Sequence, residues 1–159
     1  MGYTHYWGHP KDKQVWKDFW PQLVSDAAVI IDRAGVPLQR DYEDTRPPLL
    51  SVQEGILLNG VGGDGHEAFA MNPSGSWDFC KTARKPYDVV VATILLRARI
   101  LMGEAFSWSS DGVWGEDGPW LDAEELFGRI WPDVEIRPEL LGISYVEELV
   151  ADESDEDDE

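Results

Sequence analysis

The sequence of 159 residues contains one cysteine, Cys80, so no disulfide can form within the chain. Chains that work in reducing compartments show this sparse use of cysteine. The opening residues 1–10 lack the basic stretch and the apolar run of a secretory signal. We therefore expect a cytoplasmic protein.

Long apolar runs are also lacking. The most apolar stretch, residues 89–102, is interrupted by Arg97 and Arg99. It is shorter than the roughly 20 apolar residues that a membrane-spanning helix needs. The sequence thus predicts a soluble chain that does not cross a membrane.

Basic residues are few: 13 Lys and Arg stand against 31 Asp and Glu, for a formal net charge of -18. Nine of the acids and no base lie in residues 147–159. This predicts a single globular domain over residues 1–146, followed by a disordered acidic tail. The excess negative charge should repel duplex nucleic acid and anionic membranes, so neither is an expected partner.

Apolar spacing predicts the order of the secondary-structure elements. The expected strands are residues 3–7, 55–59, 66–71, 77–80 and 106–110, and the expected helices are residues 13–34, 86–103 and 121–131. Pro21 should kink or split the first helix, and residues 37–54 should form a long loop. Because helices do not regularly separate the strands, we expect an α+β fold of two layers. Its short, mostly antiparallel sheet would have two or three helices packed on one face.

A basic cluster precedes the second expected helix. Lys81, Arg84 and Lys85 lie within five residues, directly before the helix start at Pro86. Free backbone N–H groups and the helix dipole favour an anion at such a position, and basic side chains add to this. This pattern predicts a phosphate or carboxylate site. The alternative is that the cluster only pairs with nearby carboxylates such as Asp78.

Further residues complete the candidate ligand-binding set: Tyr87, Asp88, Tyr3 and Asn59. In the first expected strand, Tyr3, His5 and Trp7 share one face, where they could stack on a ring of the ligand or form an aromatic core.

A glycine-rich segment, residues 59–67, holds candidate catalytic groups. His66 and Glu67, with Asp64, could act as a general base or bind a metal, although a plain hairpin turn explains the same residues. The segment matches neither the P-loop nor the dinucleotide fingerprint. His5 could meet His66 across the sheet.

A third segment, residues 109–112, could supply a serine nucleophile or the carboxylate of Asp111, although Asp-Gly is also a common turn. Cys80 has no histidine at a catalytic spacing, and no set of residues has the paired spacing of a metal site. The sequence identifies no cofactor and leaves the oligomeric state open.

Several segments together resemble a family of small uncharacterised proteins from bacteria, phages and fungi. They are Met1–Trp7, Asn59–Gly60 with His66–Phe69, Phe79–Asp88 and Ser109–Gly112. The resemblance covers most of residues 1–131 and leaves out the acidic tail. It implies a shared fold but assigns no activity to any residue, and a role in nucleotide metabolism or defence would be an association only.

Three functions follow as hypotheses. The leading one is capture of a small anionic, phosphorylated ligand, for example a nucleotide, by Lys81, Arg84 and Lys85. The second is a phosphoester-type hydrolase that uses His5 or His66 with Asp64, Glu67 or Asp111. The third is a protein without catalytic activity, whose acidic tail and exposed aromatic residues meet a basic partner.

Overall fold

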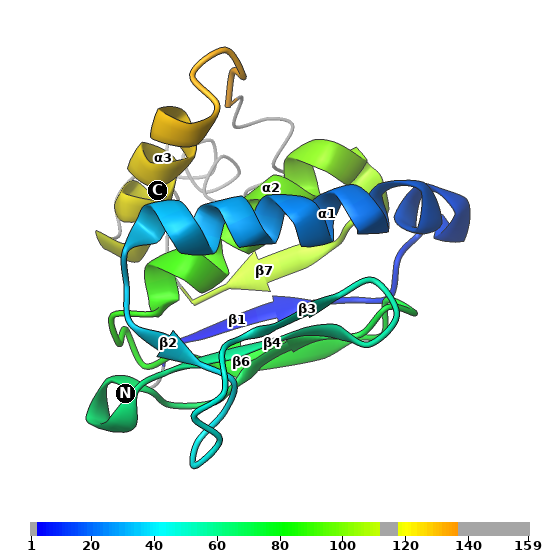
Figure 1. The fold of residues 1–159 in the computed structure, drawn as a ribbon. Coiled ribbons are helices and arrows are strands. Elements are labelled where there is room, and N and C mark those ends of the chain that lie inside the picture. The colour runs from blue at the N-terminus through cyan, green and yellow to red at the C-terminus, as the bar shows by residue number, and fades with distance from the viewer. Residues whose placement is uncertain (1–2, 112–117, 137–159) are drawn as a thin grey trace, which may run out of the picture.

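The computed structural model describes residues 3–111 and 118–136. Its elements follow in the order β1 (Thr4–Trp7), α1 (Lys13–Ala34), β2 (Leu38–Gln39), β3 (Leu49–Ser51), β4 (Gly55–Gly60), β5 (Phe69–Met71), β6 (Asp78–Lys81), α2 (Asp88–Met102), β7 (Trp108–Ser110) and α3 (Gly118–Ile130). The helices form one layer and the strands the other (Figure 1). The predicted two-layer α+β class is confirmed.

The strands form two small antiparallel sheets rather than the single sheet that the sequence suggested. In the first, β1 lies between β6 and β7; in the second, β4 pairs with β2, β3 and β5. The pairing of β4 with β5 forms a hairpin around the glycine-rich segment, in agreement with the hairpin turn that was the alternative interpretation of residues 59–67. Phe69 and Met71 are buried, while Ala70 between them is half-buried.

The first helix begins and ends at the residues that its sequence indicates. The Asp12 side chain accepts hydrogen bonds from the backbone N–H groups of Gln14 and Val15, and Gly35 ends the helix with φ 67°. Of the two expectations for Pro21, a kink or a split, the split is wrong, because α1 runs unbroken over 22 residues. Proline removes one helical hydrogen bond, and the buried apolar side chains before and after it outweigh that loss.

The second helix forms the centre of the molecule. It packs against α1 and α3, and most of its residues are buried. Arg97 donates from Nε to Asp26 of α1 at 2.8 Å, and its guanidinium lies 4.1 Å from the centre of the Trp131 ring. In the part of the chain that the structure describes, no helix is both long and apolar enough to cross a membrane.

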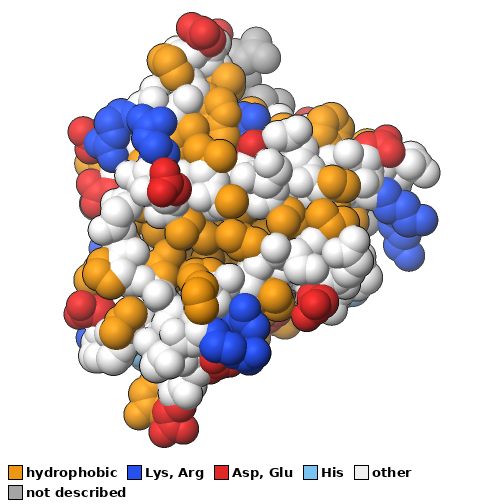
Figure 2. Space-filling view, viewed as in Figure 1, with side chains coloured by type: hydrophobic (Ala, Val, Ile, Leu, Met, Phe, Trp, Pro, Cys, Tyr) orange, Lys and Arg blue, Asp and Glu red, His pale blue; other side chains and the backbone are white. Residues whose placement is uncertain are grey.

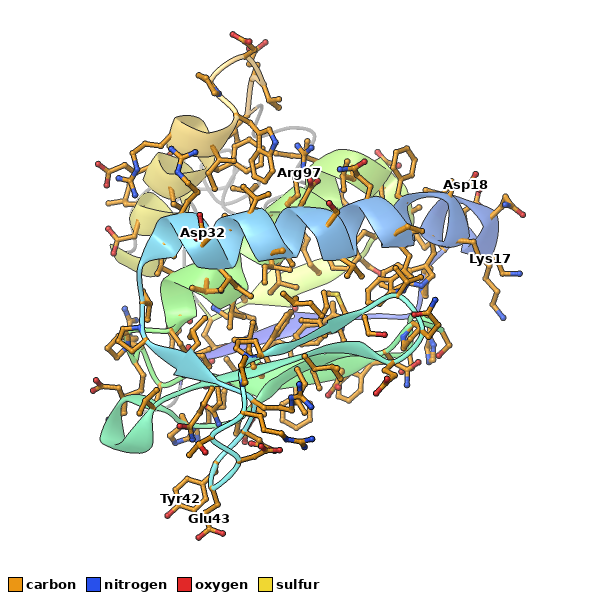
Figure 3. The ribbon with its side chains drawn as sticks, in the orientation of Figure 1. Lys17, Asp18, Asp32, Tyr42, Glu43 and Arg97 are labelled. Atoms are coloured by element: carbon orange, nitrogen blue, oxygen red, sulfur yellow. The ribbon has the colours of Figure 1, made fainter. Side chains whose placement is uncertain are left out.

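Residues 37–54 are not one long loop, since they include β2 and β3. Between these strands the chain folds back on itself, and the backbone N–H of Arg40 donates to the carbonyl of Arg46. Tyr42 and Glu43 lie at the tip of this segment and point away from the helices (Figure 3). Other expected strands are shorter than predicted, because β5 begins only at Phe69 and β7 only at Trp108.

Charged side chains lie mostly around the periphery of the view in Figure 2, while apolar side chains gather along the seam between α1 and the strands. The larger core cluster joins buried residues of all three described helices with residues of β1, β4, β5 and β6, and a smaller cluster lies between α2 and α3. The predicted acidic tail, residues 147–159, lies outside the described residues.

Candidate functional site

A row of three polar side chains crosses the first sheet on the face toward the helices. His5 on the central strand β1 pairs with Cys80 of β6 on one side and with Ser110 of β7 on the other. Directly paired residues of neighbouring strands point to the same side of a sheet. The sheet register thus brings together residues that are far apart in the sequence.

His5 connects a hydroxyl to a carboxylate. Its Nδ1 lies 2.8 Å from Oγ of Ser110, and its Nε2 lies 2.8 Å from Oδ1 of Asp88, the first residue of α2. A carboxylate only accepts hydrogen bonds, so Nε2 carries the proton toward Asp88. In the neutral imidazole the lone pair of Nδ1 then faces Ser110, whose hydroxyl can donate to it.

Aromatic rings cover this chain of hydrogen bonds. The rings of Tyr3 and Trp120 both meet the His5 ring edge to face, each with ring centres 5.3 Å apart. Nε1 of Trp120 also donates to Oγ of Ser110 at 3.2 Å. His5 and Asp88 are buried, whereas Ser110 is half-buried, so Ser110 is the member of this hydrogen-bond series that lies closest to solvent.

Asp88 also binds the turn that precedes α2. The hydroxyl of Thr82 donates to Oδ1 of Asp88, while the buried Oδ2 has no hydrogen-bond partner among the described residues. A buried acceptor without a partner is costly, unless nearby dipoles compensate. The amino end of α2 supplies such a dipole, because its positive end favours a carboxylate.

The amide groups at the start of α2 are largely used within the chain. The N–H of Asp88 donates to the carbonyl of Lys85, and the N–H groups of Val90 and Val91 donate to the carbonyl of Tyr87. An anion would therefore depend on the basic side chains more than on these amides. The predicted anion site stays a prediction, with a smaller role for the helix end than the sequence suggested.

The turn itself has an unusual backbone. Ala83 and Arg84 both adopt positive φ, 54° and 59°, although neither is glycine. Such conformations cost about 1–3 kcal/mol per residue and persist where the surroundings impose them. Here the N–H groups of Thr82 and Ala83 donate to the carbonyl of Tyr3, and the Arg84 guanidinium lies 4.1 Å from the centre of the Tyr3 ring.

The three predicted basic residues differ in their surroundings. Lys81 ends β6 and is half-buried, as is Lys85, while Arg84 is exposed. Lys81 and Lys85 form no ion pair with any residue that the structure describes. Asp78, the partner that the sequence suggested, accepts a hydrogen bond from the backbone N–H of Phe79.

Asn59, His66 and Glu67 hold the glycine-rich segment in place. The side chain of Asn59 bonds the N–H and the carbonyl of His66, at 3.1 and 3.0 Å. Nδ1 of His66 lies 2.9 Å from the carbonyl oxygen of Lys81, and Oε1 of Glu67 accepts from the N–H of Lys81 at 2.8 Å. These contacts join the segment to β6.

Two expectations for the histidines and aromatic residues are wrong. His5 does not meet His66, because β6 lies beside β1 and supplies Cys80 as the partner of His5. Tyr3 and Trp7 are only 1% and 2% exposed, so neither is available to stack on a ligand ring. This face of β1 is turned toward the helices, and it forms core and hydrogen bonds instead.

Asp111 and Tyr87 also have structural contacts. Oδ2 of Asp111 accepts from the N–H of Thr4 at 3.0 Å, which joins the end of β7 to β1. Tyr87 is fully buried and donates its hydroxyl to the carbonyl of Glu67. Burial raises the pKa of the Tyr87 phenol and the pKa of the neighbouring Cys80 thiol, so neither is a nucleophile near neutral pH.

The sequence singled out His5, Asp88 and a serine in residues 109–112 separately, but it did not join them. Thr82 and Trp120 were missed, since a threonine in a turn and a tryptophan in a helix carry no local signal of a site. Among the described residues there is no group of three His, Cys, Asp or Glu side chains that could hold a metal ion.

Comparison with models of protein families, with curated proteins and with solved structures finds no match to this chain. The function must therefore be argued from the geometry of the site.

Proposed function

We propose that this protein is a hydrolase that cleaves an ester bond in a small anionic substrate, with Ser110 as its nucleophile. The observation that supports this is the hydrogen-bond chain from Ser110 through His5 to Asp88. A nucleophile, a base in contact with it and a group that orients the base are the signature of covalent catalysis, whatever the order of the residues in the chain.

The burial of these hydrogen bonds suits covalent catalysis by Ser110. Asp88 keeps the proton of His5 on Nε2, so that Nδ1 can accept the proton of Ser110. The rings of Tyr3 and Trp120 keep water from the His5 imidazole, which strengthens its interaction with the carboxylate. Asp88 is therefore a positioning residue, while Ser110 and His5 would act on the substrate.

The reaction would proceed in two halves. As Oγ of Ser110 attacks the ester centre, its proton moves to Nδ1 of His5, which then gives it to the leaving alkoxide. An ester of Ser110 remains. Water attacks this ester and loses a proton to His5, and the proton returns to Oγ of Ser110 as the acid product leaves.

The anionic substrate is inferred from the basic residues before α2. The Arg84 guanidinium lies over the Tyr3 ring, and the same ring meets the His5 ring edge to face. Tyr3 therefore contacts both the cation and the proposed general base. A chain with a net charge of -18 repels anions over most of its surface. Arg84 and Lys85 would hold a phosphate or carboxylate group beside the site by charge-assisted hydrogen bonds.

The test compares two serines on the same strand. Ser109 and Ser110 are adjacent, but Ser109 pairs with Tyr6 on the opposite face of the sheet, so Ser109→Ala is a matched control. The assays are hydrolysis of 4-nitrophenyl phosphate and 4-nitrophenyl acetate, and covalent labelling by a fluorophosphonate located by mass spectrometry. We expect Ser110→Ala to lower kcat/KM by at least about 100-fold and to abolish labelling.

Two variants examine the other roles. His5→Gln should abolish the labelling of Ser110, while Arg84→Ala should raise KM for the phosphate ester and leave KM for the neutral acetate unchanged. Circular dichroism of each variant checks that the fold is kept. The proposal is wrong if the wild-type protein turns over neither ester and its Ser110 is not labelled, or if Ser110→Ala is as active as Ser109→Ala.

A further inference from the structure

The outer face of the first sheet, opposite to His5, carries a cluster of exposed aromatic side chains. Tyr6 of β1 pairs with Phe79 of β6, with ring centres 6.3 Å apart, and the Trp77 ring lies 5.5 Å from that of Phe79. Trp77 is 53% exposed and Phe79 is 42% exposed. A contiguous group of exposed aromatic side chains is typical of an interaction site. Single exposed apolar side chains, in contrast, are common on any protein surface.

A cleft opens beside these rings. It has a volume of about 230 Å³, and its lining includes Tyr6 and Trp77 together with the hydroxyl-bearing residues Ser107 and Ser109. Trp77 belongs both to the cleft lining and to the exposed cluster, because its ring meets that of Phe79 at 52°. The cleft is therefore continuous with the exposed aromatic cluster.

We propose that this aromatic cleft binds the cationic side chain of a lysine or arginine in a basic polypeptide. The faces of aromatic rings attract cations, most strongly for tryptophan. The chain also carries a net charge of -18. Charge complementarity thus favours a basic partner, and the hydroxyl groups of Ser107 and Ser109 are available to accept hydrogen bonds from an ammonium group.

The basic residue closest to the cluster along the strand does not prevent this. Lys81 lies two residues after Phe79 on the same face of β6 and about 13 Å along the extended chain from Trp77, the residue at which the cleft opens. A single-stranded nucleic acid could also stack on aromatic rings, but its phosphates would be repelled by the acidic surface. The cleft and the Ser110 site lie on opposite faces of the same sheet, so this inference does not depend on the proposed hydrolase.

The test uses a fluorescent ten-residue peptide of alternating lysine and glycine, and its counterpart in which every lysine is acetylated. Binding is measured by fluorescence anisotropy at physiological salt. We expect Trp77→Ala and Phe79→Ala each to weaken binding of the lysine peptide by about three- to thirtyfold. Tyr42→Ala removes an aromatic ring that is 70% exposed at the tip shown in Figure 3, and should have no effect.

Each possible result decides the proposal. The acidic chain will attract a basic peptide at long range, so binding of the lysine peptide alone does not support the proposal. Support comes from a lower affinity of Trp77→Ala for this peptide than that of Tyr42→Ala. The proposal is overturned if Trp77→Ala binds the lysine peptide as well as the wild type. It is also overturned if the acetylated peptide binds equally well, or if a ten-nucleotide oligothymidine binds more tightly than the lysine peptide.

Discussion

The Asp88 carboxylate holds the buried chain of hydrogen bonds together, and Asp88→Asn tests its contribution with almost no change of shape. Oδ1 accepts from His5 and Thr82, whereas Oδ2 has no partner in the described part of the chain. In the variant the retained oxygen still accepts from His5. The amide nitrogen replaces Oδ2, and its two hydrogens find no acceptor there.

Both changes lower the free energy of unfolding. Replacing charge-assisted hydrogen bonds by neutral ones removes about 1–2 kcal/mol. Burying an amide donor without a partner costs about 1–3 kcal/mol more. The expected total is about 2–5 kcal/mol, which lowers the urea midpoint by roughly 1–2.5 M for an m-value of about 2 kcal/mol/M.

Urea denaturation at neutral pH, followed by the fluorescence of the eight tryptophans, measures this change. Asp32→Asn is the control, because Asp32 lies on the exposed side of α1 (Figure 3) and should change stability by less than about 0.5 kcal/mol. If Asp88→Asn were as stable as the wild type, or more stable, the burial of the charge would outweigh its hydrogen bonds. The account of the site given above would then be wrong.

Two further predictions concern close packing. Gly60→Ala places a methyl group 2.2 Å from the backbone oxygen of Asp64, so it should lower the free energy of unfolding by about 1–3 kcal/mol. Gly63→Ala, which meets nothing within 4 Å, should change it by less than about 0.5 kcal/mol, and equal effects in urea denaturation would contradict this packing. Because burial raises the pKa of the Cys80 thiol, that thiol should not react with a disulfide reagent at pH 8 until the chain is unfolded in urea; rapid labelling of the native protein would show that it is accessible.

Local features of the sequence were enough to predict the main elements. Asp12 and Gly35 mark the ends of α1 because capping depends only on residues within one turn. The strand predicted at residues 66–71 is present as β5, whose larger side chains Phe69 and Met71 are the buried ones. Short strands were less predictable, since β2 has only two residues and its pairing with β4 gives no repeating pattern.

The candidate site shows the limit of such reasoning. His5, Asp88 and the serine segment were each noticed, but 105 residues separate His5 from Ser110 and 83 separate it from Asp88. No spacing rule covers such distances. Only the antiparallel register of β1 with β7, and the packing of α2 against this sheet, put the three side chains in contact.

The sequence by itself determined the acidic character of the chain, its helices and the α+β class, because composition, periodicity and capping are local properties. Tertiary structure alone decided that His5 faces inward between two strands and that Tyr6, next to it, faces outward beside Phe79. Alternation along a strand separates the two faces, but only the packing of helices against one of them decides which face becomes core and which stays exposed.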